Sequence, residues 1–112
     1  IFSYETYMQN NIKETAVLWG SFDPPTTAHK EIILTMLKEF SKVIVVINNY
    51  HNKKYQALAT HRVNMMHEML KNCDRRYTIL LQDDLNNYDY FTLHKQVVGK
   101  LYVIAGADAV HT

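Results

Sequence analysis

The chain has 112 residues, enough for one domain or part of one, and its apolar share of 47% is ordinary for a globular chain. A net charge of +1 gives the whole molecule no electrostatic footprint for nucleic acid or an acidic membrane, so we expect neither as a partner. No apolar run approaches a membrane span, and the single cysteine excludes an internal disulfide.

Polar and aromatic residues with weak periodicity open the chain, and we expect 1–14 to be an N-terminal extension, either a tail or a short extra helix. The predicted domain is 15–112. Its first strand is the apolar run at 15–19. Apolar side chains at steps of three and four predict a helix over 27–40.

The turn between this strand and this helix has one Gly, two Pro and two Thr and reads G-S-F-D-P-P-T-T-A-H from Gly20 to His29. His29 falls in the first helical turn, where exposed backbone N–H groups and the positive end of the helix dipole attract an anion. A histidine there adds a donor that can follow charge on a phosphate. The plainer alternative is a strand–turn–helix with an N-terminal threonine as its cap and His29 in solvent.

Further strands and helices alternate along the rest of the chain. In order they are strand 43–47, loop 48–59, helix 60–72 with Thr60 as its cap, strand 77–81, helix 91–98 and strand 101–105. This alternation predicts an α/β fold with a parallel sheet and helices on both faces. Ligands of such sheets bind beyond the carboxyl ends of the strands, so we expect Gly20, Asn48 and Gly106 at one edge.

The loop after the second strand carries adjacent lysines, Lys53 and Lys54, which can neutralise phosphate oxygens. Read alone, two loop lysines are more often a solvated surface. Arg62 lies in the first turn of the following helix and can hold either a neighbouring loop or a phosphate. The adjacent Asp83 and Asp84 point apart in an extended segment, which favours surface or loop capping over a metal site.

The spelling G-S-F-D-P-x-T-x-x-H resembles the signature of the nucleotidyltransferase superfamily that carries an H/T-x-x-H motif, with Thr26 at the first motif position. Within it, Lys54 (or Lys53 with a one-residue slip) and the pair His61-Arg62 resemble the lysine loop and H-R-x-x-M helix start of nicotinamide/nicotinate-mononucleotide adenylyltransferases.

Gly106-Ala107-Asp108 follows an apolar strand and resembles the G-x-D segment that lines the nucleotide sites of these enzymes. Phosphopantetheine adenylyltransferase, another member, matches less well at this segment and at the H-R pair. The resemblance therefore favours a pyridine mononucleotide as substrate. The family's final I-S-x-T-x-x-[RK] segment, and its tryptophan after the G-x-D, are not found before Thr112, so we expect a Rossmann-like fold lacking its C-terminal part.

The resemblance implies transfer of AMP from ATP to a pyridine mononucleotide with release of pyrophosphate, in NAD biosynthesis. It implies Mg²⁺ held mainly through the ATP phosphates and by no protein ligand, a cytoplasmic or nuclear location, and a homo-oligomer as one option. The implied roles are catalysis by His29 and Lys54; ATP binding by Gly20, Ser21, Phe22, Thr26, His29, Gly106 and Asp108; and mononucleotide binding by Ser21, Phe22, Lys54, Tyr90 and Thr92.

Two alternatives stay open for function, and one for a site residue. The protein could be another adenylyl- or cytidylyltransferase of the superfamily, such as phosphopantetheine adenylyltransferase, or a nucleotide-binding pseudoenzyme or regulatory module. Tyr88 is the alternative to Tyr90 as the contact of the pyridine ring.

Overall fold

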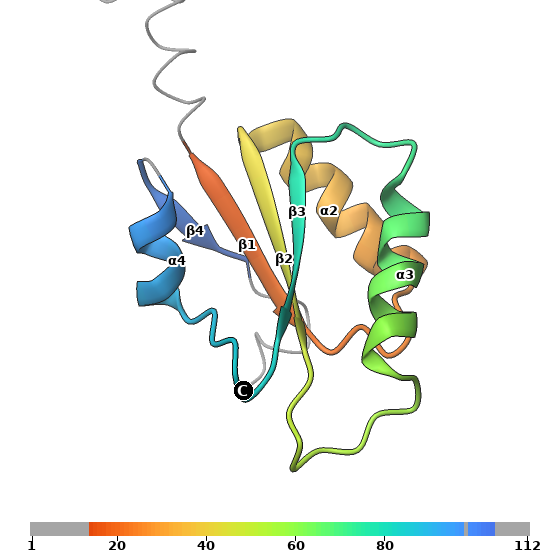
Figure 1. Ribbon diagram of the computed structural model, residues 1–112. Coiled ribbons are helices and arrows are strands. Elements are labelled where there is room, and N and C mark those ends of the chain that lie inside the picture. The colour runs from red at the N-terminus through yellow and green to blue at the C-terminus, as the bar shows by residue number, and fades with distance from the viewer. Residues whose placement is uncertain (1–13, 98, 105–112) are drawn as a thin grey trace, which may run out of the picture.

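A computed structural model describes residues 14–97 and 99–104 of the chain. Its strands form one parallel sheet in the order β3-β2-β1-β4 (Figure 1). The strands are β1 (Thr15–Gly20), β2 (Lys42–Asn48), β3 (Tyr77–Gln82) and β4 (Leu101–Val103). The predicted parallel α/β sheet is confirmed, and the fold is Rossmann-like.

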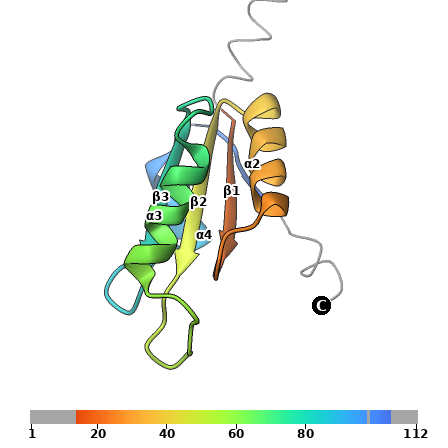
Figure 2. The same cartoon turned by 90° about the vertical axis from the view of Figure 1, so that its right-hand side faces the viewer.

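The described helices cover both faces of this sheet, as predicted. They are α2 (Thr27–Glu39), α3 (Ala59–Leu70) and α4 (Tyr90–Gln96). Figures 1 and 2 show α2 and α3 on one face and α4 on the other. No described helix has the length and apolar character needed to cross a membrane.

Strand β2 is central because its β-branched run suits burial on two faces. Val43, Val45 and Ile47 pack under α2 and α3, whereas Ile44 and Val46 pack on the α4 side. This alternation is the two-residue period of a strand. All five side chains are buried, so β2 fixes both layers of the core.

The predicted cap of α3 is wrong. The helix begins at Ala59 with Leu58 as its N-cap, and no side chain caps it there, so Thr60 already lies inside the helix. The physical reason is Arg62, whose backbone N–H bonds the Leu58 carbonyl while its side chain bonds Ala57. The other described elements begin and end within two residues of the predicted positions, a range in which helix ends ordinarily differ.

The carboxyl ends of three strands meet at one edge of the sheet. Gly20 lies beside Ile47, and Asn48 lies beside Gln82. The β1–α2 and β2–α3 connections leave from this edge, at the bottom of Figure 1. The shared edge is therefore confirmed for Gly20 and Asn48, whereas Gly106 and residues 1–13 of the expected extension 1–14 lie outside the described residues.

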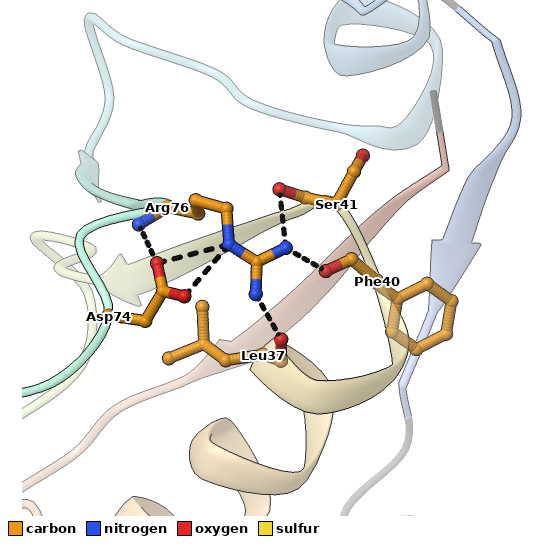
Figure 3. A network of polar contacts seen from close by, with 5 residues as sticks. All are labelled: Leu37, Phe40, Ser41, Asp74 and Arg76. Atoms are coloured by element: carbon orange, nitrogen blue, oxygen red, sulfur yellow. Dashed lines mark hydrogen bonds and ion pairs between the residues drawn. The ribbon is translucent and has the colours of Figure 1, made fainter. Parts of the chain in front are cut away.

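The opposite edge is held by Arg76, just before β3 (Figure 3). Its guanidinium donates to the carbonyls of Leu37 (2.5 Å), Phe40 (2.9 Å) and Ser41 (3.3 Å), which satisfies the C-terminal end of α2. The carboxylate of Asp74 accepts from the backbone N–H and the Nε of Arg76, each at 3.0 Å. This network fixes α2 against the sheet away from the edge where the loops gather.

The same contacts predict an acid-sensitive contribution to stability. The backbone N–H and guanidinium of Arg76 hold the pKa of Asp74 below its ordinary value of 3.8. A lowered carboxyl pKa stabilises the folded state above 3.8, and this stabilisation is lost as the pH falls through the folded-state pKa. We expect Asp74→Asn to melt below wild type at neutral pH, with the gap closing below pH 3.8. Thermal unfolding against pH measures this, and a gap that stays constant into acid would contradict it.

Candidate nucleotide site

The turn after β1 ends in a reciprocal cap between Thr26 and His29. Thr26 is the N-cap of α2, and its hydroxyl accepts the backbone N–H of His29 at 3.4 Å. In return, Nδ1 of His29 accepts the backbone N–H of Thr26 at 2.9 Å. This is a capping box with histidine where glutamate or glutamine is usual. The threonine cap belonged to the plainer alternative, and the structure assigns it to Thr26, while the predicted position of His29 in the first helical turn is confirmed.

This cap determines which nitrogen of His29 carries a proton. Because the Thr26 N–H donates to Nδ1, the neutral imidazole has its hydrogen on Nε2. The ring of Phe22 meets the His29 ring edge-on at 4.8 Å between centroids, which further fixes the imidazole. The half-buried His29 therefore presents an Nε2–H donor near the positive end of α2.

Phe22 determines the shape of the turn. Its backbone has a φ of 48°, in the left-handed region that a residue other than glycine rarely adopts, and its side chain is only 3% exposed. A Cβ atom at Gly20 would lie 3.1 Å from two atoms of the Phe22 ring. A larger residue at Gly20 would therefore press on the ring of Phe22 and, through this ring, on His29. Ser21, which lies between Gly20 and Phe22 in the chain, is exposed.

Asp23 joins this turn to the β2–α3 connection. Its two carboxylate oxygens accept the backbone N–H groups of Gln56 (2.5 Å) and Ala57 (2.8 Å). No role for Asp23 could be predicted from the sequence, because its partners lie 33 and 34 residues further along the chain. The local signal was an aspartate in a proline-rich turn, a residue type that often accepts backbone N–H groups.

The buried side chain of Arg62 also joins the turn after β1 to the β2–α3 connection. The residue is 0% exposed and donates to the carbonyls of Ser21 (3.0 Å), Asn48 (2.7 Å) and Ala57 (3.0 Å). A fourth bond runs to Oδ1 of Asn49 at 2.8 Å. Of the two predicted roles, the structure supports the holding of neighbouring loops. A guanidinium suits this place because its N–H donors stand in a fixed planar fork and can bond several acceptors at once.

We expect Arg62→Met to lower the free energy of unfolding by about 3 kcal/mol or more, because several buried acceptors lose their partner at once. Arg62→Lys recovers only part of the loss, because an ammonium group cannot match the fork. Urea unfolding measures both. Lys71→Ala is the control, since Lys71 is exposed and forms a surface ion pair with Glu68 of α3. Equal stability of Arg62→Met and wild type would contradict the role.

Both candidate lysines are exposed on the loop at the same edge as His29. Nζ of Lys53 lies 5.8 Å from the centre of the Tyr50 ring. Lys54 is next along the loop, two residues before the Gln56 N–H that Asp23 holds. The structure thus brings the lysine loop and the histidine turn to one edge and fastens them to each other.

The candidate residues for the pyridine ring belong to α4 and the segment before it, on the other face of the sheet. Asp89 caps α4 by accepting the backbone N–H of Thr92 at 2.8 Å, and this bond holds the pKa of Asp89 below its ordinary value. Tyr90 is 41% exposed and stacks on His94. Tyr88 is half-buried, and its carbonyl accepts Nε1 of Trp19 at 3.1 Å, so it is Tyr88 that lies against β1.

Two hollows flank the β2–α3 loop. One, of about 500 Å³, is lined by residues of the loop and the start of α3, among them Tyr55, Leu58 and Thr60. The other, of about 300 Å³, is lined by residues of the β2–α3 loop, such as Tyr50, and of the segment after β3, such as Asp84. Within the described residues, no group of three or more His, Cys, Asp or Glu side chains could hold a metal ion. Gly106 and Asp108 lie outside the described residues.

Comparison with known families and sequences points to nucleotidyl transfer. The cytidylyltransferase-like family model matches residues 17–112. The phosphopantetheine adenylyltransferase of Desulfatibacillum aliphaticivorans is 38% identical over 60 residues, which are 54% of this chain and 34% of that protein. The enzyme of the same name from Natranaerobius thermophilus is 36% identical over 74 residues, 65% of this chain and 43% of its own. The chain thus spans less than half of these relatives.

Solved structures with this fold include a Plasmodium falciparum nicotinic acid mononucleotide adenylyltransferase complexed with NaAD. The TM-score is 0.64 at 25% identity, and the match covers 88% of this chain and 54% of that one. A NadR protein in complex with NAD and AMP-PNP gives the same TM-score at 13% identity, over 88% of this chain and 33% of that one. The second likeness concerns the fold alone.

Proposed function

The chain belongs to the cytidylyltransferase-like family of the nucleotidyltransferase superfamily, and from this premise we propose that the whole protein transfers AMP from ATP to a pyridine mononucleotide in NAD biosynthesis. One observation carries the proposal. The reciprocal cap of Thr26 and His29 sets an imidazole N–H at the positive end of α2, on the edge where the Lys54 loop is fastened. A pentacoordinate phosphorus needs donors arranged in this way.

The reaction requires alignment of two anions more than acid–base chemistry. An oxygen of the mononucleotide phosphate attacks the α-phosphorus of ATP in line, and the bond from that phosphorus to the pyrophosphate oxygen breaks. Charge grows on the oxygens around the α-phosphorus as the new bond forms. His29 donates through Nε2, Lys54 adds a mobile positive charge, and no covalent protein intermediate is needed.

The other residues of the turn hold the substrates in place. Gly20, Ser21 and Phe22 offer backbone contacts to ATP, and Thr26 keeps His29 oriented. Magnesium enters with ATP, held by phosphate oxygens and water, and neutralises phosphate charge when bound. Arg62 and Asp23 contact neither substrate in this proposal and keep the two loops together.

Residues on α4 and beyond β4 complete the proposed site. Tyr90 and Thr92 are proposed for the mononucleotide, with Tyr88 as the alternative to Tyr90. Gly106 and Asp108 are proposed for ATP, with Asp108 accepting ribose hydroxyls, and these two roles rest on the sequence resemblance.

Support for a pyridine acceptor is the likeness to the Plasmodium enzyme over 88% of this chain, together with the His61-Arg62 helix start. The second candidate is transfer of AMP to phosphopantetheine. It is favoured by the names of the curated relatives, which are 36% and 38% identical to parts of this chain. Both candidates use the same donor, the same turn and the same in-line displacement, so they differ only in the acceptor.

A panel of acceptors tests the proposal. Pyrophosphate release by the full-length protein is measured with ATP and nicotinate mononucleotide, nicotinamide mononucleotide or phosphopantetheine, each alone. We expect release with one or both pyridine mononucleotides and none with phosphopantetheine. The reverse result would establish the second candidate. Binding of ATP without release for any acceptor would identify a nucleotide-binding module.

A further inference from the structure

The loop that carries Lys54 is attached to the end of β3 at two points, which we call the clasp. In the first, Nε2 of Gln82 donates to the hydroxyl of Tyr50. In the second, Nδ1 of His51 lies 2.6 Å from Oδ2 of Asp84. The clasp lies beside a backbone bond of 2.7 Å between the Asn49 N–H and the Gln82 carbonyl, so the two segments run together beyond the sheet.

The two points of the clasp differ in strength. Gln82 is only 8% exposed, and its Oε1 is buried without a hydrogen-bond partner in the described part of the chain. The Tyr50 hydroxyl pairs with Nε2 of this amide, and its loss would leave Nε2 as well as Oε1 without that partner. His51 and Asp84 have side chains 79% and 49% exposed, where an ion pair contributes little.

Tyr50 is also the residue on which the loop closes. Its backbone N–H donates to the hydroxyl of Tyr55 at 3.1 Å, and its carbonyl accepts the N–H of Lys53 at 3.2 Å. The ring of Tyr55 in turn lies 4.1 Å from the guanidinium carbon of Arg62. The segment from Tyr50 to Tyr55, which includes the exposed Lys54, is thus a turn held by contacts at both of its ends.

We propose that Tyr50 and Gln82 are positioning residues for Lys54: their hydrogen bond fixes the path of the loop, so the ammonium group meets the phosphates in one arrangement. The inference rests on the proposed function, because it assigns Lys54 to phosphate charge. It also links two parts of the site. The segment after Gln82 leads to Tyr90 and Thr92, so this hydrogen bond is one of the contacts that join the side proposed for the acceptor to the side proposed for phosphate.

Tyr50→Phe removes only the hydroxyl and is the first test, in the full-length protein. We expect kcat to fall about tenfold to a hundredfold, as displaced catalytic groups do, with a smaller change in KM for ATP. We expect amide hydrogens of residues 50–55 to lose protection from exchange. Tyr77→Phe, at the other end of β3, is the matched control and should change neither. A Tyr50→Phe protein with normal kcat and normal protection would overturn the proposal.

A double variant separates positioning from stability. Tyr50→Phe leaves the buried Gln82 amide unpaired, whereas Tyr50→Phe/Gln82→Leu removes both polar groups and should recover most of the lost stability. The hydrogen bond between Tyr50 and Gln82 is still absent, so kcat and loop protection should stay low. Recovery of kcat together with stability would show a merely structural contact and would contradict the proposal.

The Lys54→Met background tests whether the clasp acts through Lys54. There, Tyr50→Phe should lower kcat no further, because the group that it positions is already gone. A further loss as large as in wild type would overturn the inference. Exchange at residues 50–55 needs no substrate, so the clasp is judged separately from the chemistry. A wild-type protein that transfers AMP to no acceptor would refute the proposed function, while unchanged protection in Tyr50→Phe would refute the positioning role of the bond between Tyr50 and Gln82.

Discussion

Replacing His29 with alanine is expected to lower kcat about a hundredfold to a thousandfold, the usual loss when one donor to transition-state charge is removed. Binding of the mononucleotide should change little, because the donor matters most when charge grows on the α-phosphorus. The structure gives the reason: Nδ1 is occupied by the Thr26 N–H, so Nε2 carries the proton to be donated. Steady-state kinetics with both substrates, alongside mononucleotide titration, measure the two quantities.

His29 also caps α2, so its two roles must be separated. His29→Gln is the matched variant, since glutamine at this position of a capping box can still accept the Thr26 N–H. We expect His29→Gln to keep the stability of wild type, and His29→Ala to lose about 1 kcal/mol of it through the cap. If the imidazole is catalytic, kcat of both variants should be far below that of wild type. Near-normal kcat in His29→Ala would mean that His29 serves only as a cap.

Lys54→Met is expected to lower kcat by about a hundredfold, as the loss of a charge aimed at the transition state does, and to raise KM for ATP much less. A flexible ammonium group on an exposed loop can close on the phosphates when both substrates are bound. Lys53→Met is the matched control, because it removes the neighbouring positive charge of the same exposed loop and leaves Lys54 in place. Kinetics at saturating and at limiting ATP distinguish the two parameters.

Two results would change this view of the lysines. A rise in KM with kcat unchanged would mean that Lys54 holds ATP equally in the ground and transition states. If Lys53→Met and Lys54→Met proteins are both as active as wild type, the two lysines are solvated surface residues without a catalytic role, as most lysines are.

Much of the fold could be predicted from local patterns. The run from Val43 to Ile47 identified a strand buried on both faces, and the apolar steps of α2 identified its helix. The start of α3 could not be predicted, because no side chain caps it and it depends on Arg62, which bonds Ala57 and is also held by Ser21 and Asn48 from other segments. A helix start can be predicted from sequence when a nearby side chain caps it. It cannot be predicted when a contact with a distant segment determines where the helix begins.

The candidate site follows the same division. Thr26 and His29 are three residues apart, so their cap was within reach of the sequence, and Arg62 was correctly expected as a loop anchor among its alternatives. The contacts of Asp23 were not predicted, since no local pattern encodes partners more than 30 residues away. The contact between Tyr50 and Gln82 was hidden for the same reason, with 32 residues between them.

The fate of the α-phosphorus of ATP tests the central claim most directly. The full-length protein is incubated with a pyridine mononucleotide and ATP labelled either at the α- or at the γ-phosphorus. We predict that the α label appears in the dinucleotide product and that the γ label leaves in pyrophosphate, as in-line attack at the α-phosphorus requires. Label from the γ-phosphorus in the acceptor, or no transfer of the α label to either pyridine mononucleotide, would contradict the account.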